Sequence, residues 1–268
     1  MAAKFDRVAA DIRQRITSND LKPGDRLPPE TTLMEEYGVA LGTIRRAMAL
    51  LEAEQHIVRV HGRGTFVQQR RTRVERSNDR YQWEKDRVAL PDEERAAEGA
   101  SERDTGLPAD SFDFKPRYER TEADADLATA FGVAEGTPLL RRTFRTRVKE
   151  ETAPFQVTIS HLRADHIEKN PDLFDEAKGW WAGGTQHQLS TVGIEVARIE
   201  DRVLARPATS DEAAEFDITP GSPVVADRKT SISNDGEVVE VADNVWPADR
   251  IALTFTTNLE ANRTGDDG

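Results

Sequence analysis

The segment 27–67 constrains the fold more tightly than any other part of the chain. Pro28-Pro29 suits the first turn of a helix, where a missing backbone N–H leaves no hydrogen bond unmade, and Gly38 suits the left-handed cap that ends it. Apolar residues then recur at helical spacing over 41–54, and short apolar runs flank the turn Gly62-Arg63-Gly64. The sequence therefore predicts a helix, a turn, a second helix and a hairpin with an arginine at its tip.

A stretch before this segment, residues 5–17, predicts another helix, because its apolar residues form a single stripe. Three helices followed by a hairpin make a winged helix-turn-helix, whose last helix enters the major groove of DNA. There arginine pairs with guanine and threonine meets a thymine methyl or a phosphate, while a glycine-flanked arginine can approach the minor groove. The residues expected to contact DNA on these grounds are Thr43, Arg45, Arg46, Gly62, Arg63 and Gly64.

A solvated helix face with two ordinary arginines would explain the helix alone equally well. The hairpin directly after it favours DNA binding, and the distribution of charge agrees. Residues 1–73 carry 13 Lys and Arg against 9 Asp and Glu, a net charge of +4, whereas residues 74–268 carry 24 against 40, a net charge of −16. A basic head on an acidic body is expected when only the head meets phosphates.

At this point the chain resembles the DNA-binding domain of the GntR family of bacterial transcription regulators. The match is ungapped over roughly residues 5–67, and its most specific part is the run from Gly62 to Val67. The other matching residues are Leu27-Pro28, Glu30, Gly38-Val39, Thr43-Ile44-Arg45 and Ala47-Met48. The resemblance implies that the third helix lies in the major groove and the hairpin tip in the minor groove. It also implies DNA contacts for Thr43, Arg45, His61, Gly62 and Arg63.

Two departures from this family pattern bear on specificity. Thr31 and Leu41 stand where relatives usually have arginines that touch DNA. Each missing bidentate arginine removes about 1–3 kcal/mol of base discrimination. Arg46, where relatives often have glutamine, compensates for part of this. We therefore expect an operator unlike the common half-site of the family.

The composition limits where the protein works and what chemistry it carries. The chain has no cysteine, which fits a reducing cytoplasm and excludes disulfides and thiol nucleophiles. It has no apolar run near 18 residues and no signal-peptide core at its N-terminus. We expect a cytoplasmic protein, associated with the nucleoid when bound to DNA, with no cofactor, no metal and no membrane partner.

The expected domain organisation has four parts. Residues 1–69 form the winged helix, and 70–110 form a linker with a charged segment, in which 92–105 is a solvated helix or a mobile loop. Residues 111–260 form the second domain, and 261–268 a disordered tail. The basic run Arg70-Arg71-Thr72-Arg73 is expected to add nonspecific phosphate affinity.

The second domain contains a weak internal repeat. Residues 131–140 parallel residues 216–225, with an offset of 85, and each copy joins an acidic helix to a strand through a Gly-Thr/Ser-Pro turn. Further strands are expected at 112–120, 154–161, 195–205, 238–245 and 251–257, and helices at 122–130, 165–176, 185–192 and 210–216. This pattern predicts an α+β fold, one antiparallel sheet with helices on one face.

Several polar residues of this domain are candidates for a ligand pocket. Arg145 and Arg147 alternate along one strand and share a face, where an anion or acidic side chains would meet them. Gly184 and Thr185 open a helix, Glu240 lies on a late strand, and Trp246 could form an apolar wall. Each residue taken singly has a structural explanation, as a salt bridge, a capping turn or a core aromatic.

The same region resembles the UTRA effector domain of the HutC-type branch of the GntR family, including actinobacterial repressors of plasmid-transfer genes. The resemblance covers roughly residues 118–259, and the fold it implies is similar to that of chorismate lyase. It implies an effector pocket lined by the residues matching Arg145, Arg147, Glu240 and Trp246. Thr158 stands where relatives often carry a ligand-binding glutamate, which puts a sugar-phosphate effector in doubt.

The sequence thus predicts a homodimeric, ligand-responsive repressor that leaves a palindromic operator when a small molecule with an anionic group binds. One alternative is a DNA-binding dimer whose second domain senses nothing. Another is an enzyme, which five His residues, no cysteine and no Ser-His-Asp pattern disfavour. A fused DNA-binding head would bring an enzyme no obvious benefit.

Overall fold

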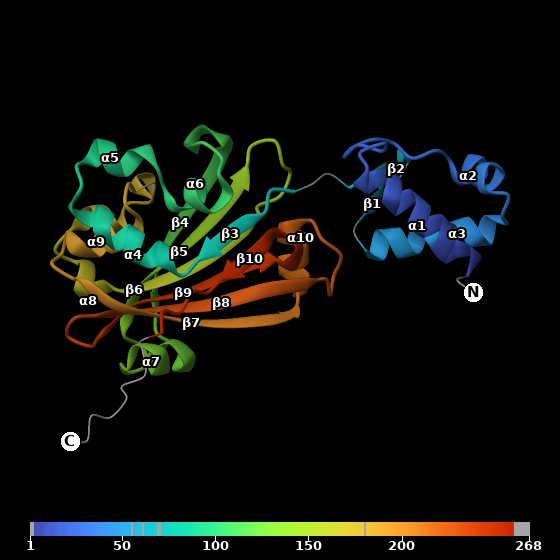
Figure 1. Cartoon of the computed structure of the whole chain (residues 1–268). Coiled ribbons are helices and arrows are strands. Elements are labelled where there is room, and N and C mark those ends of the chain that lie inside the picture. Colours follow the sequence, from blue (N-terminus) through green and yellow to red (C-terminus); the bar gives the residue numbers. More distant parts are fainter. Residues whose placement is uncertain (1–2, 55, 61, 69–70, 180, 260–268) are drawn as a thin grey trace, which may run out of the picture. The chain divides into compact units, whose positions relative to one another are not determined.

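A computed structural model of the chain describes residues 3–54, 56–60, 62–68, 71–179 and 181–259. The chain divides into two compact units, residues 1–71 and 72–268 (Figure 1). No helix among the described residues is long and apolar enough to cross a membrane. The tail predicted for residues 261–268 lies outside the described residues.

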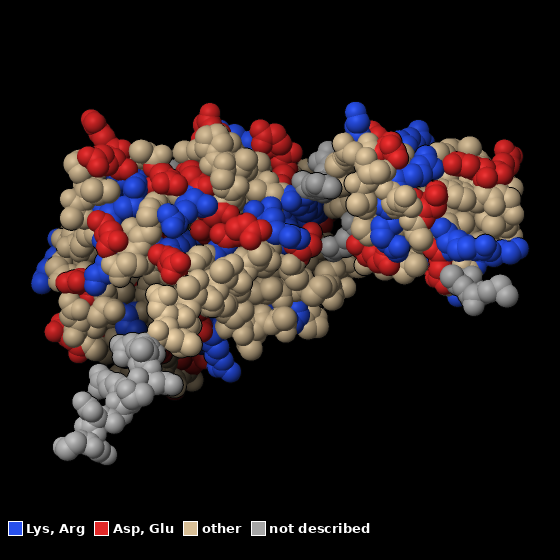
Figure 2. Space-filling view, in the orientation of Figure 1, with Lys and Arg blue, Asp and Glu red and all other residues tan. Residues whose placement is uncertain are grey.

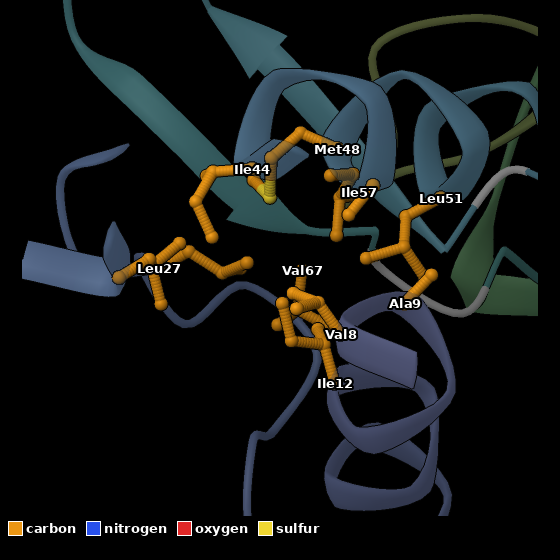
Figure 3. Packing of buried hydrophobic residues seen from close by; sticks show 11 residues of the cluster. Val8, Ala9, Ile12, Leu27, Ile44, Met48, Leu51, Ile57 and Val67 are labelled. Carbon is orange, nitrogen blue, oxygen red and sulfur yellow. The ribbon is translucent and has the colours of Figure 1, made fainter. Parts of the chain in front are cut away.

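The first unit has the predicted winged helix architecture. Its helices are α1 (Lys4–Thr17), α2 (Glu30–Tyr37) and α3 (Leu41–Ala53), and its antiparallel hairpin is β1 (Ile57–Val60) and β2 (Gly64–Val67). Gly38 caps α2 with a φ of 60°, the left-handed conformation that glycine tolerates best. The apolar stripes of α1 and α3 meet the hairpin in one buried cluster (Figure 3), so the core fixes which side of α3 faces outward.

The second unit is built on one six-stranded antiparallel sheet. Its strand order is β4-β5-β6-β9-β8-β7. The strands are β4 (Phe112–Glu122), β5 (Pro138–Val148), β6 (Gln156–Arg163), β7 (Val196–Pro207), β8 (Pro223–Ser233) and β9 (Val238–Pro247). Its α-helices are α4 (Asp79–Asp86), α5 (Asp92–Ala97), α6 (Ala100–Thr105), α7 (Ala125–Phe131), α8 (Ala164–Ile167), α9 (Gly184–Ser190) and α10 (Ser210–Phe216). Short 3-10 turns are η1 (Arg87–Ala89), η2 (Ala109–Ser111), η3 (Pro171–Phe174), η4 (Glu176–Lys178) and η5 (Ala248–Arg250).

The internal repeat appears as two matching halves of this sheet. In each half a strand, a helix and two further strands follow one another, β4-α7-β5-β6 and β7-α10-β8-β9. Gly136 and Gly221 occupy equivalent turns, with φ angles of 82° and 83°. The halves join where β6 pairs with β9, so the sheet order reads symmetrically from both edges.

Helices cover both faces of the sheet, and the expectation of helices on one face was wrong. Buried residues of α7 pack against Val241, and those of α10 pack near Val245. Helix α9 packs on the opposite face, against Leu140 and Leu162. The reason is that the strands carry apolar side chains on both faces: Leu139 and Val241 pack with α7, whereas Leu140 and Leu162 pack with α9.

The segment expected to be a linker is part of the second unit. Residues Val74–Ser77 form strand β3, which pairs in parallel with β10 (Ile251–Thr254), a strand that does not belong to the main sheet. Arg250 donates from Nε to the carbonyl of Thr72 at 3.1 Å and pairs with Glu151 at 2.5 Å. The charged residues before position 110 are therefore fastened by pairing with the end of the chain, which no local pattern reveals.

Residues 92–105 form the helices α5 and α6, which are exposed at 92–94 and 96–98 but bury three charged side chains. Arg95, Glu102 and Asp104 are buried there, and Arg80 of α4 forms an ion pair with Asp104. Charge composition favoured solvent exposure, but these charges are paired or lie against a cavity. We call residues 79–105, which comprise α4, η1, α5 and α6, the covering segment. Figure 1 shows its helices and α9 on the same side of the sheet.

Candidate DNA-binding surface and ligand cavity

Helix α3 turns the expected DNA-contacting residues outward. Ile44, Ala47, Met48 and Leu51 are buried, which leaves Gly42, Arg45 and Arg46 exposed and Thr43 partly exposed. Small residues stand at the N-cap, Ala40, and at Gly42 and Thr43 of the first turn, so the helix backbone can approach a groove closely. In Figure 2 the visible face of this unit shows Lys and Arg interleaved with Asp and Glu.

An acidic residue of α2 orients Arg45. The Oε2 atom of Glu30 lies 3.0 Å from Nε of Arg45, and its Oε1 atom lies 3.7 Å from Arg59 of the hairpin. Arg59 also pairs with Glu52 at 3.2 Å. Glu30 therefore stands between the helix and the hairpin and holds two arginines that the sequence places fourteen residues apart. Sequence analysis did not single out Arg59.

Arg46 has a different environment. Its guanidinium carbon lies 4.5 Å from the ring centroid of Phe5 in α1, a cation–π contact. The structure thus directs Arg46 toward α1, although its side chain remains exposed. Its contribution to DNA binding stays a prediction.

The hairpin tip has the predicted shape. Gly62 and Gly64 have φ angles of 72° and 122°, which L-residues rarely adopt, and Arg63 between them is exposed. His61 lies outside the described residues. Arg26, which sequence analysis missed, crosses the hairpin at Gly64: a Cβ atom at that glycine would lie 2.8 Å from Nε of Arg26. A bridge between Arg26 and Phe66 aligns the two segments, so a third exposed arginine lies beside Arg59 and Arg63 at the hairpin.

The pocket expected from Arg145, Arg147, Glu240 and Trp246 does not form as one site. Side chains alternate between the two faces of a strand. Arg142 of β5 lies on the face that carries Glu240 and pairs with it, whereas Arg145 and Arg147 lie on the other face. The predicted alternation places Arg145 and Arg147 on one face, as the structure does. Alternation alone does not tell whether this pair or Arg142 faces Glu240.

Arg145 and Arg147 are engaged on their own face of the sheet. Arg145 pairs with Glu215 of α10 at 2.9 Å and borders an open groove of about 760 Å³. Arg147 pairs with Asp113 at 2.6 Å and donates to the carbonyl of Glu151 at 2.6 Å.

Glu240 is the centre of a buried network on the other face. It is 2% exposed, accepts from Ser160 at 2.7 Å, and pairs with Arg142 at 3.1 Å and Lys229 at 2.7 Å. Burial alone would raise the pKa of Glu240, but the charges of Lys229 and Arg142 lower it to about 2. This carboxylate is therefore ionised at neutral pH, and its partners leave it little capacity for a ligand.

Gly184 and Thr185 lie beside this network, whereas Trp246 does not. Thr185 Oγ1 accepts from Arg142 at 3.3 Å, and the amide of Gly184 donates to the carbonyl of Trp181 at 3.0 Å. The Gly184 amide is thus used within the turn. Trp246 is fully buried in a core with Val74, Phe112 and Phe155.

A cavity of about 220 Å³ lies between the sheet and the covering segment. Phe114 and Phe144 stack in its wall with ring centroids 5.3 Å apart. Thr146, Gln156 and Thr158 contribute polar groups from the strands, and Thr185 and Gln188 contribute them from α9, where Gly184 also lines the cavity. A partly open, partly aromatic cavity with convergent hydrogen-bonding groups is a common form of small-molecule site.

The described residues hold no group of three or more His, Asp and Glu suited to a metal. Nδ1 of the partly buried His187 accepts from Trp181 at 2.6 Å, and burial lowers the pKa of both His161 and His187.

Comparisons with known families agree with both units. Residues 4–67 match the bacterial regulatory proteins of the gntR family, and residues 116–252 match the UTRA domain. An HTH-type transcriptional regulator of Streptomyces coelicolor is 29% identical over 95% of this chain and 92% of its own. The histidine utilization repressor of Klebsiella aerogenes is 27% identical over 93% of this chain and 92% of its own. The repressor NagR of Bacillus subtilis is 23% identical over 92% and 91%.

Solved structures share the fold. A crystal structure of a GntR-family transcriptional regulator superposes with a TM-score of 0.59 at 21% identity and covers 96% of this chain and 98% of its own. PhnF from Mycobacterium smegmatis superposes with a TM-score of 0.52 at 20% identity and covers 94% of this chain and all of its own.

Proposed function

Because the chain belongs to the gntR family of bacterial regulatory proteins and carries a UTRA domain, we propose that it is a homodimeric repressor released from a palindromic operator by a small molecule. It is a DNA-binding transcription regulator, like its relatives. Beyond DNA binding, we propose that the protein is a dimer, that its operator is palindromic, that it represses transcription and that it acts in the cytoplasm. The observation that carries ligand control is the cavity of about 220 Å³ in the same chain as the winged helix.

DNA binding rests on α3 and the hairpin. Thr43 and Arg45 would contact bases in the major groove, and Arg63 with its flanking glycines would contact the minor groove. Arg26 and Arg59 lie beside them and would contact phosphates, which position the protein on the duplex. The acidic second unit, with a net charge of −16 from residue 74 onward, keeps the rest of the molecule off the DNA.

Ligand control rests on the covering segment. A ligand in the cavity contacts both the sheet and residues 80–102, so it favours the arrangement of the covering segment that fits it. Release requires that this arrangement bind operator less well, because a ligand shifts an equilibrium only through different affinities for the two states.

The test begins with selection of a duplex from a random pool by the full-length protein. Anisotropy with the selected duplex then measures affinity, and inserting five base pairs between its half-sites tests the dimer. That insertion rotates one half-site by about half a turn relative to the other, so a dimer should lose most of its affinity and a monomer none. Candidate metabolites are added last, and a repressor of this kind requires at least one that releases the duplex.

A further inference from the structure

The cavity contains a carboxylate that the protein leaves without a hydrogen-bond donor. Glu102 of α6 lines the cavity and is 8% exposed. Both of its carboxylate oxygens are buried without a hydrogen-bond partner among the described residues. Burial of an unpaired carboxylate is strongly unfavourable, so such a group in a native fold requires an explanation.

The position of Glu102 in its helix does not supply that explanation. It is the third residue of α6, where a glutamate commonly reaches back to the amide of the N-cap residue. Here the N-cap is Gly99, and that bond is not formed. The carboxylate lies against the glycine instead: a Cβ at Gly99 would lie 2.5 Å from Oε2. Any other residue at this position would displace the carboxylate.

The cations around the cavity are committed to other groups. Arg80 pairs with Glu84 at 3.0 Å and with Asp104. Arg87 donates to three backbone carbonyls at 2.6–3.2 Å. Among the described lining residues, these arginines offer Glu102 no ion pair within 4 Å.

One donor in the same wall also lacks a partner. Arg95 binds Asp92 and the carbonyl of Leu90 through its two terminal nitrogens. Its Nε atom is buried and has no acceptor among the described residues. The lining thus presents one unmatched acceptor group, Glu102, and one unmatched donor, Nε of Arg95.

We propose that the effector is a small amino compound whose ammonium group binds Glu102 and whose oxygen acceptor binds Nε of Arg95. The stacked pair of Phe114 and Phe144 would contact its apolar part. This inference rests on the proposed function and narrows its ligand class. It also replaces the anionic effector expected from Arg145 and Arg147, because an anion without an amine would leave Glu102 unmatched and be repelled by it.

The test uses the full-length protein and sets of three probes that share a side chain. Phenylalanine, phenethylamine and 3-phenylpropanoate form one set, and leucine, isopentylamine and 4-methylpentanoate form another. Calorimetry should show the amino acid binding most tightly, the amine next and the acid least. Glu102→Gln should weaken both amino compounds at least tenfold and strengthen binding of the acid, because the charge that repels it is gone. Glu98→Gln is the control, because Glu98 lines the same cavity but is exposed.

Stability without any ligand gives a second measurement. If Glu102 is kept for a ligand, then Glu102→Gln relieves an unpaired charge and the melting temperature rises by about 2–4 °C, while Glu98→Gln changes it little. A lower melting temperature for Glu102→Gln would mean that the charge serves the helix, and it would overturn the proposal.

The binding results can also overturn it. The proposal is refuted if the acids bind as tightly as the amino compounds. It is also refuted if Glu102→Gln leaves the affinity for the amines unchanged, or if no probe binds. A metabolite without an amine that releases the operator would refute the ligand class and leave the proposed function intact. Failure of every compound to alter operator binding would refute ligand control itself.

Discussion

The Nε atom of Arg45 lies 3.0 Å from Oε2 of Glu30, so the first residue of α2 fixes an arginine of α3 whose side chain is 64% exposed. An ion pair this exposed contributes about 0–1 kcal/mol to stability. Its main effect is to reduce the conformations that Arg45 samples before it meets DNA, which lowers the entropy lost on binding.

Replacing Arg45 should therefore weaken operator binding without unfolding the protein. For Arg45→Ala we expect a loss of about 1–3 kcal/mol, typical of a base-contacting arginine, with relaxed specificity at one base pair. Anisotropy with the operator and single-base variants measures both. Arg13→Ala is the control, since Arg13 pairs with Glu54 just beyond the end of α3. Equal affinities for the two variants would exclude Arg45 from the interface.

Gly42 should separate stability from binding. It is exposed in α3, and a Cβ there would meet no atom within 4 Å. Gly42→Ala should therefore stabilise the free protein by about 0.5–1 kcal/mol through helix propensity. Operator affinity should fall, because the added methyl group occupies the face that enters the groove. Urea unfolding and anisotropy on the same preparation measure the two effects, and a gain in both would place this face away from DNA.

The face of the sheet that senses the effector can be tested with two substitutions. Arg145 borders the groove opposite the cavity, and Thr185 lines the cavity. We expect Arg145→Ala to keep its response to an effector and Thr185→Val to require about tenfold more of it. The readout is the effector concentration that releases half of the bound operator. The reverse order would assign sensing to the groove.

Removing Glu240 should be among the most damaging changes in the second unit. Glu240→Ala leaves buried Arg142 and partly buried Lys229 as uncompensated charges, and loss of one partner of a buried pair costs about 3–5 kcal/mol. Glu200 offers a control, because it forms an exposed pair with Arg198, and Glu200→Ala should change stability by less than about 0.5 kcal/mol. Denaturant unfolding compares them. A small effect at Glu240 would mean that water or movement rescues the two cations.

The pH dependence of stability follows from two carboxyl groups whose pKa values shift in opposite directions on folding. The folded-state pKa of Glu240 is lowered from 4.5 to about 2, so its stabilisation is present above pH 4.5 and lost as the pH falls toward 2. Burial, reinforced by the charge of Asp201, raises the pKa of Asp227 from 3.8 to about 6. Asp227 therefore favours the fold below pH 3.8, and this contribution is lost as the pH rises through 6.

Asp227→Asn should accordingly raise the melting temperature above pH 6 and have little effect below pH 4. Melting curves from pH 4 to 8 test this, with Asp235→Asn in the exposed β8–β9 turn as the control. A constant difference across that range would mean that Asp227 titrates normally.

Local chemistry made much of the fold predictable. The bounds of α10 follow from Thr209, which caps it in a capping box with Glu212. The β8–β9 hairpin follows from Asn234-Asp235-Gly236, where Gly236 has a φ of 81°. In the first unit, helical periodicity fixed which residues of α3 are buried, and so which face outward.

The ligand site could not be predicted in this way from local sequence patterns. Adjacent residues Leu139 and Leu140 of β5 are both buried, because helices cover both faces of the sheet. The strand therefore has no single apolar face from which to decide whether Arg142 or Arg145 points toward Glu240. The covering segment looked solvated because its charges are numerous, and only their pairing in three dimensions shows that they enclose a cavity.

The pairing of β3 with β10 joins residues 74–77 to residues 251–254. Residues 74–77 therefore belong to the second unit and are not part of the forty-residue linker that the charge pattern indicated. Helix α4 begins only two residues after β3 ends, so the covering segment starts from a strand that the end of the chain holds in place. Truncation before residue 251 would remove that partner strand, and it should loosen the start of the covering segment and weaken the response to an effector.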